Sequence, residues 1–254
     1  MNNIKVDISF YNADKFIERC LMSVLTQDYQ NFHIILINDG SNDNSDKIIQ
    51  EILKVYSDKI TYINNIENMG AMYNHQNMVL NYCEPNDIVV NLDGDDWLSN
   101  SNVLSYINDF YKSNDCWLMY GQYKFLSSGR YGTSKPYLSE EMFEKKRELD
   151  FMVSHIRTFK AFTFQEIKNQ DPELNCFKDS NGDWYSMTCD VAMMYPLMEI
   201  CGYEKVKYND KVLYIYNDTN PISDVKKDMG LQLRIHNEIN NKPKFKKLNK
   251  WVIV

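Results

Sequence analysis

Short apolar runs alternate with amphipathic segments through the first half of the chain. Continuous apolar runs such as FHIILI (32–37) and DIVVNL (87–92) are typical of strands that are buried on both faces of a sheet. In residues 13–27 apolar side chains recur every three or four positions, which predicts an amphipathic helix. By the same criteria we predict further strands at 4–10, 60–63 and 116–125, and further helices at 43–56, 71–83 and 101–111. Strands that alternate with helices favour an α/β fold with a mostly parallel sheet flanked by helices.

The pattern is less regular after residue 126, and the region to the end of the chain reads as helical and mixed structure. The apolar spacing there predicts one or two strands within 206–216 and helices at 139–147, 155–167, 190–201 and 223–240. The tail, KPKFKKLNKWVIV (242–254), is basic and ends in an apolar run. We expect it to pack on the domain as a terminal strand or helix. Weak contact with an anionic membrane surface, as a peripheral protein, or with a partner is the alternative.

Length and composition limit the classes of protein to consider. A chain of 254 residues with 44% hydrophobic and 25% charged residues suits one globular domain. The net charge of −7 argues against nucleic acid as a partner, because phosphate backbones bind basic surfaces. No apolar stretch approaches the ~20 residues that span a bilayer, the first residues lack a signal-peptide core, and the six cysteines show no metal or redox spacing. We therefore expect a cytoplasmic protein with reduced thiols and no transmembrane segment, and we leave a homodimer open.

The stretch VVNLDGDDWL places three carboxylates, those of Asp93, Asp95 and Asp96, directly after a buried strand. Two other predicted strands run into SFYN (9–12) and NDGS (38–41). Because ligands of open α/β sheets bind outside the carboxyl ends of the strands, we expect these three segments to line one rim. Three like charges so close together repel one another, and a bound cation would offset that repulsion.

Common acidic and phosphate-binding motifs do not explain this stretch. An EF-hand needs Gly at position six and Glu at position twelve, and no such loop starts at Asp39 or Asp93. The P-loop and the dinucleotide-binding glycine pattern are missing as well. A D-x-D arrangement suited to Mg²⁺ or Mn²⁺ remains, with substrate phosphates completing the ligand shell. The alternative is that Asp95 or Asp96 caps a following helix, and we expect one of them to do so.

Several motifs follow one another in order over residues 4–125. The run from Ser9 to Ser45 contains S-F-Y-N, S-V-L-T-Q and N-D-G-S-N-D; it is followed by Asn68-Met69-Gly70 and by Asp93-Gly94-Asp95. This series resembles the opening of the family 2 glycosyltransferases of GT-A fold, and the motifs together are far more specific than any one alone. The resemblance implies that residues 1–125 form a nucleotide-sugar-binding half, and that residues 126–254 form the acceptor-side half of the same single domain.

The resemblance also implies roles for the rim residues. Asp39 would accept from the ring N–H of uracil, and Ser9 and Tyr11 would hold the base, with Tyr11 stacking on it rather than packing in the core. Asp93 would contact the ribose or the metal, and Asp95 would be the main metal ligand, so both are expected as metal ligands. The matched motifs add four nucleotide-sugar contacts: Asn12, Asn68, Gly70 and Gly94.

The sequence departs from the family at one position. Many members carry A-R-N shortly after N-x-G, but residues 70–77 read GAMYNHQN and contain no arginine. Asn74 or His75 could take over its contact with the nucleotide; an imidazole at this place could also pack or face solvent. Arg157, two residues after His155, is a further nucleotide-sugar-binding candidate, because arginine suits bidentate phosphate contacts. A solvent-exposed helix face is the equally weighted alternative for this pair.

The family's catalytic base is commonly a carboxylate at the start of a helix, which points to Asp190. A helix cap is the alternative role for Asp190, and Asp183 is the second candidate for the base. Trp184 and Tyr185 could form the floor of a sugar site or belong to the core.

Two further segments have open assignments. His236 could be a late metal ligand, although a surface histidine is the simpler interpretation. Residues 214–221 could close over the diphosphate or form an ordinary turn.

The resemblance predicts a glycosyltransferase that moves a hexosyl or N-acetylhexosaminyl group from a UDP-sugar to an acceptor hydroxyl with inversion. Mn²⁺ or Mg²⁺ is the expected cofactor, and the acceptor, whether glycan, protein or lipid, is not defined by the sequence. A catalytically degenerate nucleotide-sugar-binding protein is the main alternative, because the A-R-N arginine is missing. A sugar nucleotidyltransferase is a weaker one, since such enzymes usually begin with a glycine-rich phosphate loop.

Overall fold

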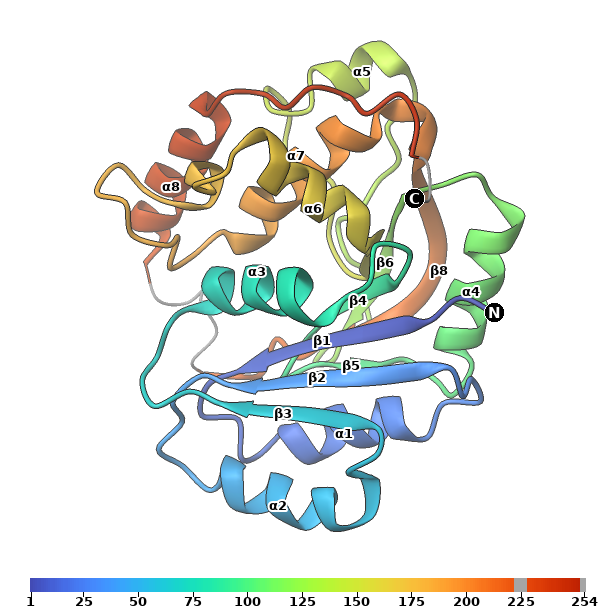
Figure 1. The fold of residues 1–254 in the computed structure, drawn as a ribbon, viewed down its shortest axis with the longest axis vertical. Helices are drawn as coiled ribbons and strands as arrows, with labels where there is room; N and C mark the ends of the chain where they lie inside the picture. The colour runs from blue at the N-terminus through green and yellow to red at the C-terminus, as the bar shows by residue number, and fades with distance from the viewer. Residues whose placement is uncertain (222–227, 252–254) are drawn as a thin grey trace.

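A single eight-stranded sheet runs through the computed structural model, which describes residues 1–221 and 228–251 (Figure 1). The strand order is β3-β2-β1-β4-β7-β6-β8-β5. Strands β1 to β4 pair in parallel, β7 pairs antiparallel with both of its neighbours, and β6 pairs in parallel with β8. The predicted α/β fold with a mostly parallel sheet is therefore confirmed. The strands are β1 (Ile4–Phe10), β2 (Phe32–Asn38), β3 (Ile60–Asn64), β4 (Ile88–Asp93), β5 (Trp97–Leu98), β6 (Leu118–Phe125), β7 (Arg157–Lys160) and β8 (Val206–Tyr216).

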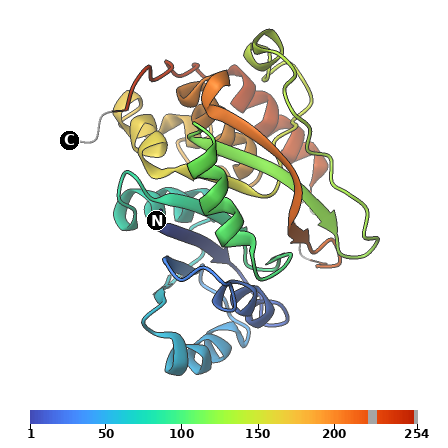
Figure 2. The same ribbon diagram turned by 90° about the vertical axis from the view of Figure 1, so that its right-hand side faces the viewer.

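The two faces of the sheet support two hydrophobic cores. Successive side chains of a strand point to opposite faces, so Ile34 and Leu36 join one core while Ile35 and Ile37 join the other. Helices α1, α2 and α4 cover the first core, and α3, α5, α6, α7 and α8 cover the second (Figures 1 and 2). The helices are α1 (Ile17–Leu25), α2 (Ser45–Tyr56), α3 (Ala71–Tyr82), α4 (Val103–Ser113), α5 (Glu140–Glu144), α6 (Ala161–Gln170), α7 (Cys189–Cys201) and α8 (Met229–Asn241).

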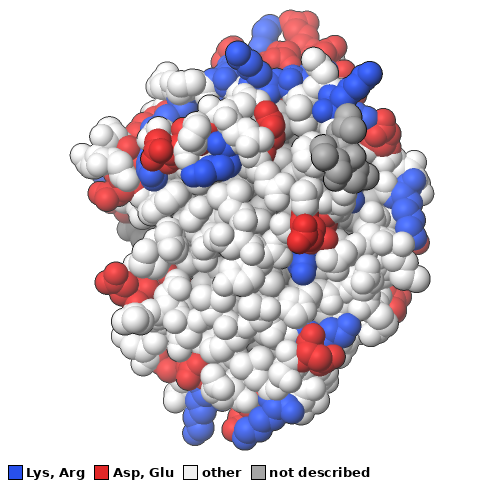
Figure 3. Space-filling view, in the orientation of Figure 1, with Lys and Arg blue, Asp and Glu red and all other residues white. Residues whose placement is uncertain are grey.

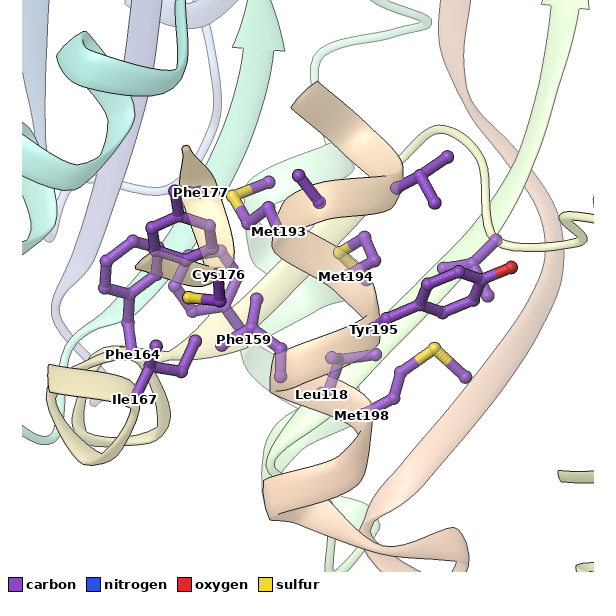
Figure 4. Close-up of a cluster of buried hydrophobic side chains, with 14 of the residues drawn as sticks. Leu118, Phe159, Phe164, Ile167, Cys176, Phe177, Met193, Met194, Tyr195 and Met198 are labelled. Carbon is purple, nitrogen blue, oxygen red and sulfur yellow. The ribbon is translucent and has the colours of Figure 1, made fainter. Parts of the chain in front are cut away.

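Helix α7 passes through the middle of the second core. Every residue from Val191 to Cys201 is buried, which is expected of a helix that is apolar around nearly its whole circumference; Glu199 is the charged exception. Its side chains Met193, Met194 and Met198 pack among aromatic and aliphatic residues of the sheet and of α6 (Figure 4). Because the body of α7 is fixed in this way, the position of its first turn is fixed as well.

A buried ion pair joins α7 to the end of the chain. Arg147 donates from Nε and Nη2 to the two carboxylate oxygens of Glu199, at 2.7 and 2.9 Å, and from Nη1 to the carbonyls of Ile239 and Lys242 at the end of α8. Glu199 also accepts from the backbone N–H of Phe245 at 3.0 Å. This set of bonds satisfies both charges and holds α5, α7, α8 and the tail together.

The described part of the tail, residues 242–251, packs on the domain as expected, but without forming a strand or a helix. Residues 243–251 are irregular; the N–H of Leu248 bonds to the carbonyl of Ile200, and Trp251 stacks on Phe162 at 4.4 Å. Lys247 pairs with Glu204. Over α5 and the tail, Lys and Arg side chains are mixed with Asp and Glu (Figure 3). No helix within the described residues combines the length and the apolar character needed to cross a membrane.

Several element boundaries differ from the sequence prediction. The helix expected at 155–167 is instead strand β7 followed by α6, because residues 157–160 pair with β4 and β6 and tertiary pairing overrides the helical spacing. The segment after Asp96 is the short strand β5, so no helix follows for an aspartate to cap. The helix expected at 139–147 is limited to α5, and residues 222–227, at the start of the helix expected at 223–240, lie outside the described residues.

Removing one partner of the buried ion pair should destabilise the fold. We expect Glu199→Ala to lower the free energy of unfolding by about 3–5 kcal/mol, because the Arg147 charge stays buried without its partner. Urea denaturation measures the change. Glu51→Ala is the matched control: its pair with Lys54 is about two-thirds exposed, so its loss should cost at most ~1 kcal/mol. Equal effects of the two substitutions would contradict a stabilising role of the buried pair.

Candidate active site

The carboxyl ends of the central parallel strands meet at one edge of the sheet. Phe10 lies opposite Asn38 in the β1–β2 pair, and Ser9 lies opposite Asp93 in the β1–β4 pair. Strand β7 runs in the other direction, so its first residue, Arg157, lies opposite Asn91 near the same edge. The predicted rim of three strand ends is confirmed, and β7 adds a fourth segment that the sequence analysis assigned to a helix.

The acidic loop after β4 lies against β1. A Cβ atom at Gly94 would lie 2.4 Å from the Cβ of Phe10, so only glycine allows this close approach. Asp93 and Asp95 are half-buried on either side of it. Asp95 accepts a hydrogen bond of 2.6 Å from the side-chain amide of Asn220 in the turn after β8. The segment 214–221 therefore does lie beside the acidic loop; closure over a diphosphate stays a prediction.

Asp96 is wholly buried and is not a helix cap. It accepts from the hydroxyl of Tyr214 and from the backbone N–H of Asn217, both at 2.6 Å. Burial, followed by the charges of Asp93 and Asp95, raises the pKa of the Asp96 carboxyl well above its usual value. Asp96 thus connects the loop to the end of β8 and experiences the repulsion that the sequence implied.

One group of potential metal-ligating side chains is found within the described residues: Asp93, Asp96 and His155, whose ligand atoms lie within 4.8 Å of one another. Two of these three are engaged elsewhere. The Nδ1 atom of His155 accepts from Arg157 at 3.0 Å, because burial and then the Arg157 charge lower the pKa of His155 well below its usual value and keep it neutral. Both oxygens of Asp96 have donors. His236, partly exposed on α8, is not in this group.

Asp39 organises the loop between β3 and α3. Its carboxylate accepts from the side-chain amide of Asn65 (3.0 Å) and from the backbone N–H groups of Met69 (2.9 Å) and Gly70 (3.0 Å). An ionised carboxylate has about four acceptor positions, so one remains for a ligand. Gly40 has φ of 74° and a Cβ there would lie 2.7 Å from the backbone of residue 67, so both its conformation and its contact require glycine.

The two side chains considered as replacements for the missing arginine are buried. Asn74, with no exposed surface, donates to the hydroxyl of Ser9 at 3.2 Å and accepts from Asn65 at 3.0 Å. His75 lies 2.6 Å from a carboxylate oxygen of Asp7. Burial lowers the pKa of His75, but the charge and hydrogen bond of Asp7 outweigh it, so the pKa is raised. These buried contacts hold residues of the rim in place. The alternative that His75 faces solvent is wrong.

The residues at the end of β1 are arranged differently. Tyr11 is 42% exposed, so the alternative of core packing is wrong for its ring. Asn12 has φ of 51°; its N–H donates to the hydroxyl of Ser41, and its side-chain oxygen accepts from the N–H of Asn42. Asn68 is exposed on the loop that Asp39 holds.

On the other side of the rim, Asp190 occupies the first turn of α7. Thr188 holds the N-cap position, but its side chain makes no cap hydrogen bond; Asp190 accepts from the first-turn N–H of Val191 at 2.9 Å, so it bonds to the helix terminus without being the N-cap residue. Its Oδ2 atom lies 3.4 Å from Nη1 of Arg157, and Nη2 of Arg157 lies 3.6 Å from Oδ2 of Asp93. The structure therefore brings Asp93 and Asp190 to the same guanidinium.

Arg157 is 3% exposed, so the alternative of a solvent-exposed helix face is wrong. Burial acts against its charge, but the carboxylates of Asp93 and Asp190 outweigh it and raise the pKa of Arg157. Asp183, by contrast, is exposed in a turn that is bonded to Asp179. Tyr185 is buried and belongs to the core, and half-buried Trp184 packs edge-on against Tyr73 at 5.8 Å.

Sequence reasoning missed several side chains that support the site. Asp7 is buried in β1, a strand that is otherwise apolar at its buried positions. A charged residue within such an apolar run could have been recognised from the sequence. The sequence singled out the segment 214–221, but not the bonds of Tyr214 and Asn220 within it, and it gave no signal for Asn65, because the partners of all three lie far away in the chain.

Comparisons with known proteins agree on the family and the fold. The family model described as Glycosyl transferase family 2 matches residues 6–168. A teichoic acid poly(glycerol phosphate) polymerase of Staphylococcus epidermidis is 34% identical over 110 residues, 43% of this chain and 15% of that protein. The glycosyltransferase GlyA of Streptococcus pneumoniae serotype 4 is 33% identical over 111 residues, 44% of this chain and 15% of that protein. The match thus covers a small part of these relatives.

Solved structures resemble most of the fold. Staphylococcus aureus TarS 1-349 in complex with UDP-GlcNAc has a TM-score of 0.63 at 17% identity, covering 89% of this chain and 61% of that one. The mannosyltransferase PcManGT of Pyrobaculum calidifontis, in complex with GDP-Man and Mn²⁺, has a TM-score of 0.57 at 14% identity, covering 84% and 56%. At these identities the likeness shows a shared fold only, and it agrees with the expected GT-A architecture.

The buried pair of His75 and Asp7 should make stability depend on pH. A raised pKa means that the protonated form of His75 stabilises the fold below pH ~6.5, and that this contribution is lost as the pH rises through the higher pKa of the folded state. We expect the difference in unfolding free energy between wild type and His75→Gln to be larger at pH 6 than at pH 9, measured by urea denaturation. A difference that stays constant over this range would show that the imidazole is not charged in the fold.

Proposed function

The chain belongs to glycosyl transferase family 2, and we propose that it transfers a hexosyl or N-acetylhexosaminyl group from a UDP-sugar to an acceptor hydroxyl with inversion. One observation carries the proposal: the acidic loop after β4 and the carboxylate at the start of α7 converge on Arg157 at the rim of the sheet. A donor bound by the acidic loop and an acceptor activated by the carboxylate of α7 would meet there. In this arrangement residues 1–125 serve the donor and residues 126–254 the acceptor.

The donor side has the groups that a uridine nucleotide needs. Asp39 has one remaining acceptor position for the ring N–H of uracil, and its carboxylate is held rigidly by three donors. Tyr11 has an exposed ring that can stack on the base. The similar TarS structure is a complex with UDP-GlcNAc, which supports a UDP-sugar, whereas the PcManGT structure is a complex with GDP-Man, so the base requires a direct test.

A divalent cation fits the acidic loop. Three carboxylates lie within four residues, and burial, followed by the charges of Asp93 and Asp95, raises the pKa of Asp96. Asp93 and Asp95 are the half-buried members, with oxygen atoms of the type that Mn²⁺ and Mg²⁺ prefer, and we assign the metal to these two. Bound there, the ion would supply Lewis-acid stabilisation of the leaving diphosphate.

Asp190 is the proposed general base. It would take the proton of the acceptor hydroxyl while that oxygen attacks the anomeric carbon from the face opposite the diphosphate, and the bond to the diphosphate oxygen would break. Positioned base catalysis contributes roughly 10²–10⁴-fold to rates. The first turn of α7 suits this role, because the buried helix behind it keeps the carboxylate in place at the rim.

A protein that binds a nucleotide sugar without transferring it is the second candidate. It is favoured by the missing arginine in residues 70–77, where the side chains of Asn74 and His75 are buried. Release of UDP from a UDP-sugar separates the two candidates. No disulfide is found among the described residues, which include all six cysteines, and this agrees with the cytoplasmic location that we propose.

Loss of Asp95 should abolish the metal-dependent part of donor binding. In a thermal-shift panel of UDP- and GDP-sugars with and without Mn²⁺, we expect one UDP-sugar to stabilise the wild-type protein, by about 2.7 kcal/mol at one hundred times its Kd. Asp95→Ala should remove the Mn²⁺-dependent increment. Asp58→Ala is the matched control, since exposed Asp58 precedes β3 at the opposite edge of the sheet. An unchanged increment in Asp95→Ala would refute the metal assignment.

Loss of the base should separate binding from transfer. Asp190→Asn should bind UDP with Mn²⁺ as wild type does, yet release UDP from the best donor of the panel about 10²–10⁴-fold more slowly. Asp183→Asn serves as the paired control, because Asp183 is the other candidate and is exposed in a turn. If Asp183→Asn is slow and Asp190→Asn is not, Asp183 is the base.

A further inference from the structure

Arg157 contacts both catalytic parts of the proposed site, Asp93 of the acidic loop and Asp190 of α7. Its guanidinium lies 3.6 Å from Asp93 and 3.4 Å from Asp190, and it donates to Nδ1 of His155 at 3.0 Å. His155 is itself stacked on Tyr214, with ring centroids 4.3 Å apart and planes 14° from parallel. The neutral imidazole of His155 therefore fixes the orientation of the Arg157 guanidinium, which lies between the carboxylates of Asp93 and Asp190.

The other buried arginine shows what a purely structural pair looks like in this fold. Arg147 makes two short bonds to Glu199 and two to backbone carbonyls, so its donors are nearly all used. The contacts of Arg157 with its carboxylates are longer than hydrogen bonds, and its Nε is buried without a partner among the described residues. We therefore infer that the role of Arg157 lies in its charge and in its position between two carboxylates, and not in short hydrogen bonds that stabilise the fold.

The same geometry argues against a phosphate ligand. Arg157 is 3% exposed and lies between two carboxylates that neutralise it, so a diphosphate would have to displace one of them. A guanidinium presents donors in a fixed planar fork, and this fork can hold two separate carboxylates in one relative geometry; the ammonium of lysine is a point charge and cannot.

We propose that Arg157 is a positioning residue that fixes Asp190 relative to Asp93, and so aligns the base with the donor. This inference rests on the proposed function and deepens it. Residues 70–77 lack the arginine that many family members use for the nucleotide, and Arg157 at the start of β7 does not take over that role. Arg157 instead serves the base, Asp190. Arg157 touches neither donor nor acceptor in this account, and its effect passes through Asp190.

A double-mutant cycle tests the proposal in the full chain. The variants are Arg157→Gln, Asp190→Asn and the two combined, with Arg234→Gln, an exposed arginine on α8, as the control. The readouts are UDP release from the best donor, the Kd of UDP with Mn²⁺ by calorimetry, and urea denaturation. We expect Arg157→Gln to slow UDP release about 100-fold while the Kd of UDP stays within about twofold. The combined variant should be no slower than Asp190→Asn alone, since one residue acts through the other.

Two results would overturn the proposal. A loss of UDP affinity in proportion to the loss of rate would make Arg157 a ligand of the nucleotide. Rate losses that multiply in the combined variant would show that Arg157 does not act through Asp190. If Arg157→Gln does not fold, Arg157→Lys gives the same test, because lysine keeps the charge but cannot hold both carboxylates in one geometry; UDP release should again slow at unchanged UDP affinity. Failure of the proposed function would be seen earlier, in wild-type protein that binds UDP but releases none from any donor.

Discussion

The constraint on which the site depends is the mutual repulsion of three carboxylates at one edge of the sheet, which other groups must offset. Parallel pairing brings the ends of β1, β2 and β4 to the same edge, and β4 delivers three carboxylates there within four residues. The fold offsets part of this charge in two ways: Asp96 is buried with two donors and a raised pKa, and Arg157 stands beside Asp93. What remains is negative charge on half-buried Asp93 and Asp95, which suits a cation carried in with an anionic donor.

The cores explain why this edge can be so polar. Each strand end is fixed by apolar residues on both faces, and α7, buried along its length, fixes the turn that carries Asp190. The Arg147–Glu199 pair then holds α7 to α8 and to the tail on the far side. The polar groups of the rim therefore sit on rigid elements and can be arranged for ligands rather than for stability.

The sequence was informative where the signal is local. The apolar runs of β2 and β4 and the motifs that follow them place Asp39 and Asp93 at strand ends, as observed. It was misleading at 155–167, because a short strand pairing on both sides has no periodicity long enough to compete with a helical pattern. It gave no access to the partners of Asp39, Asp95 and Asp96, since those contacts join residues 26 to 125 positions apart. The sequence thus identified the polar side chains at the rim from their residue types and motifs. The residues that bond to them could be identified only from the structure.

The central claim is that Asp93 and Asp95 bind a divalent cation that holds the diphosphate of a uridine nucleotide. The most direct measurement is a crystal structure with UDP and Mn²⁺, with the ion located by its anomalous scattering. The account predicts a manganese peak that is bonded to oxygens of Asp93 or Asp95 and of the diphosphate, with uracil beside Asp39 and Tyr11. A manganese ion held instead by Asp96 and His155, or UDP bound with neither aspartate near an ion, would contradict it.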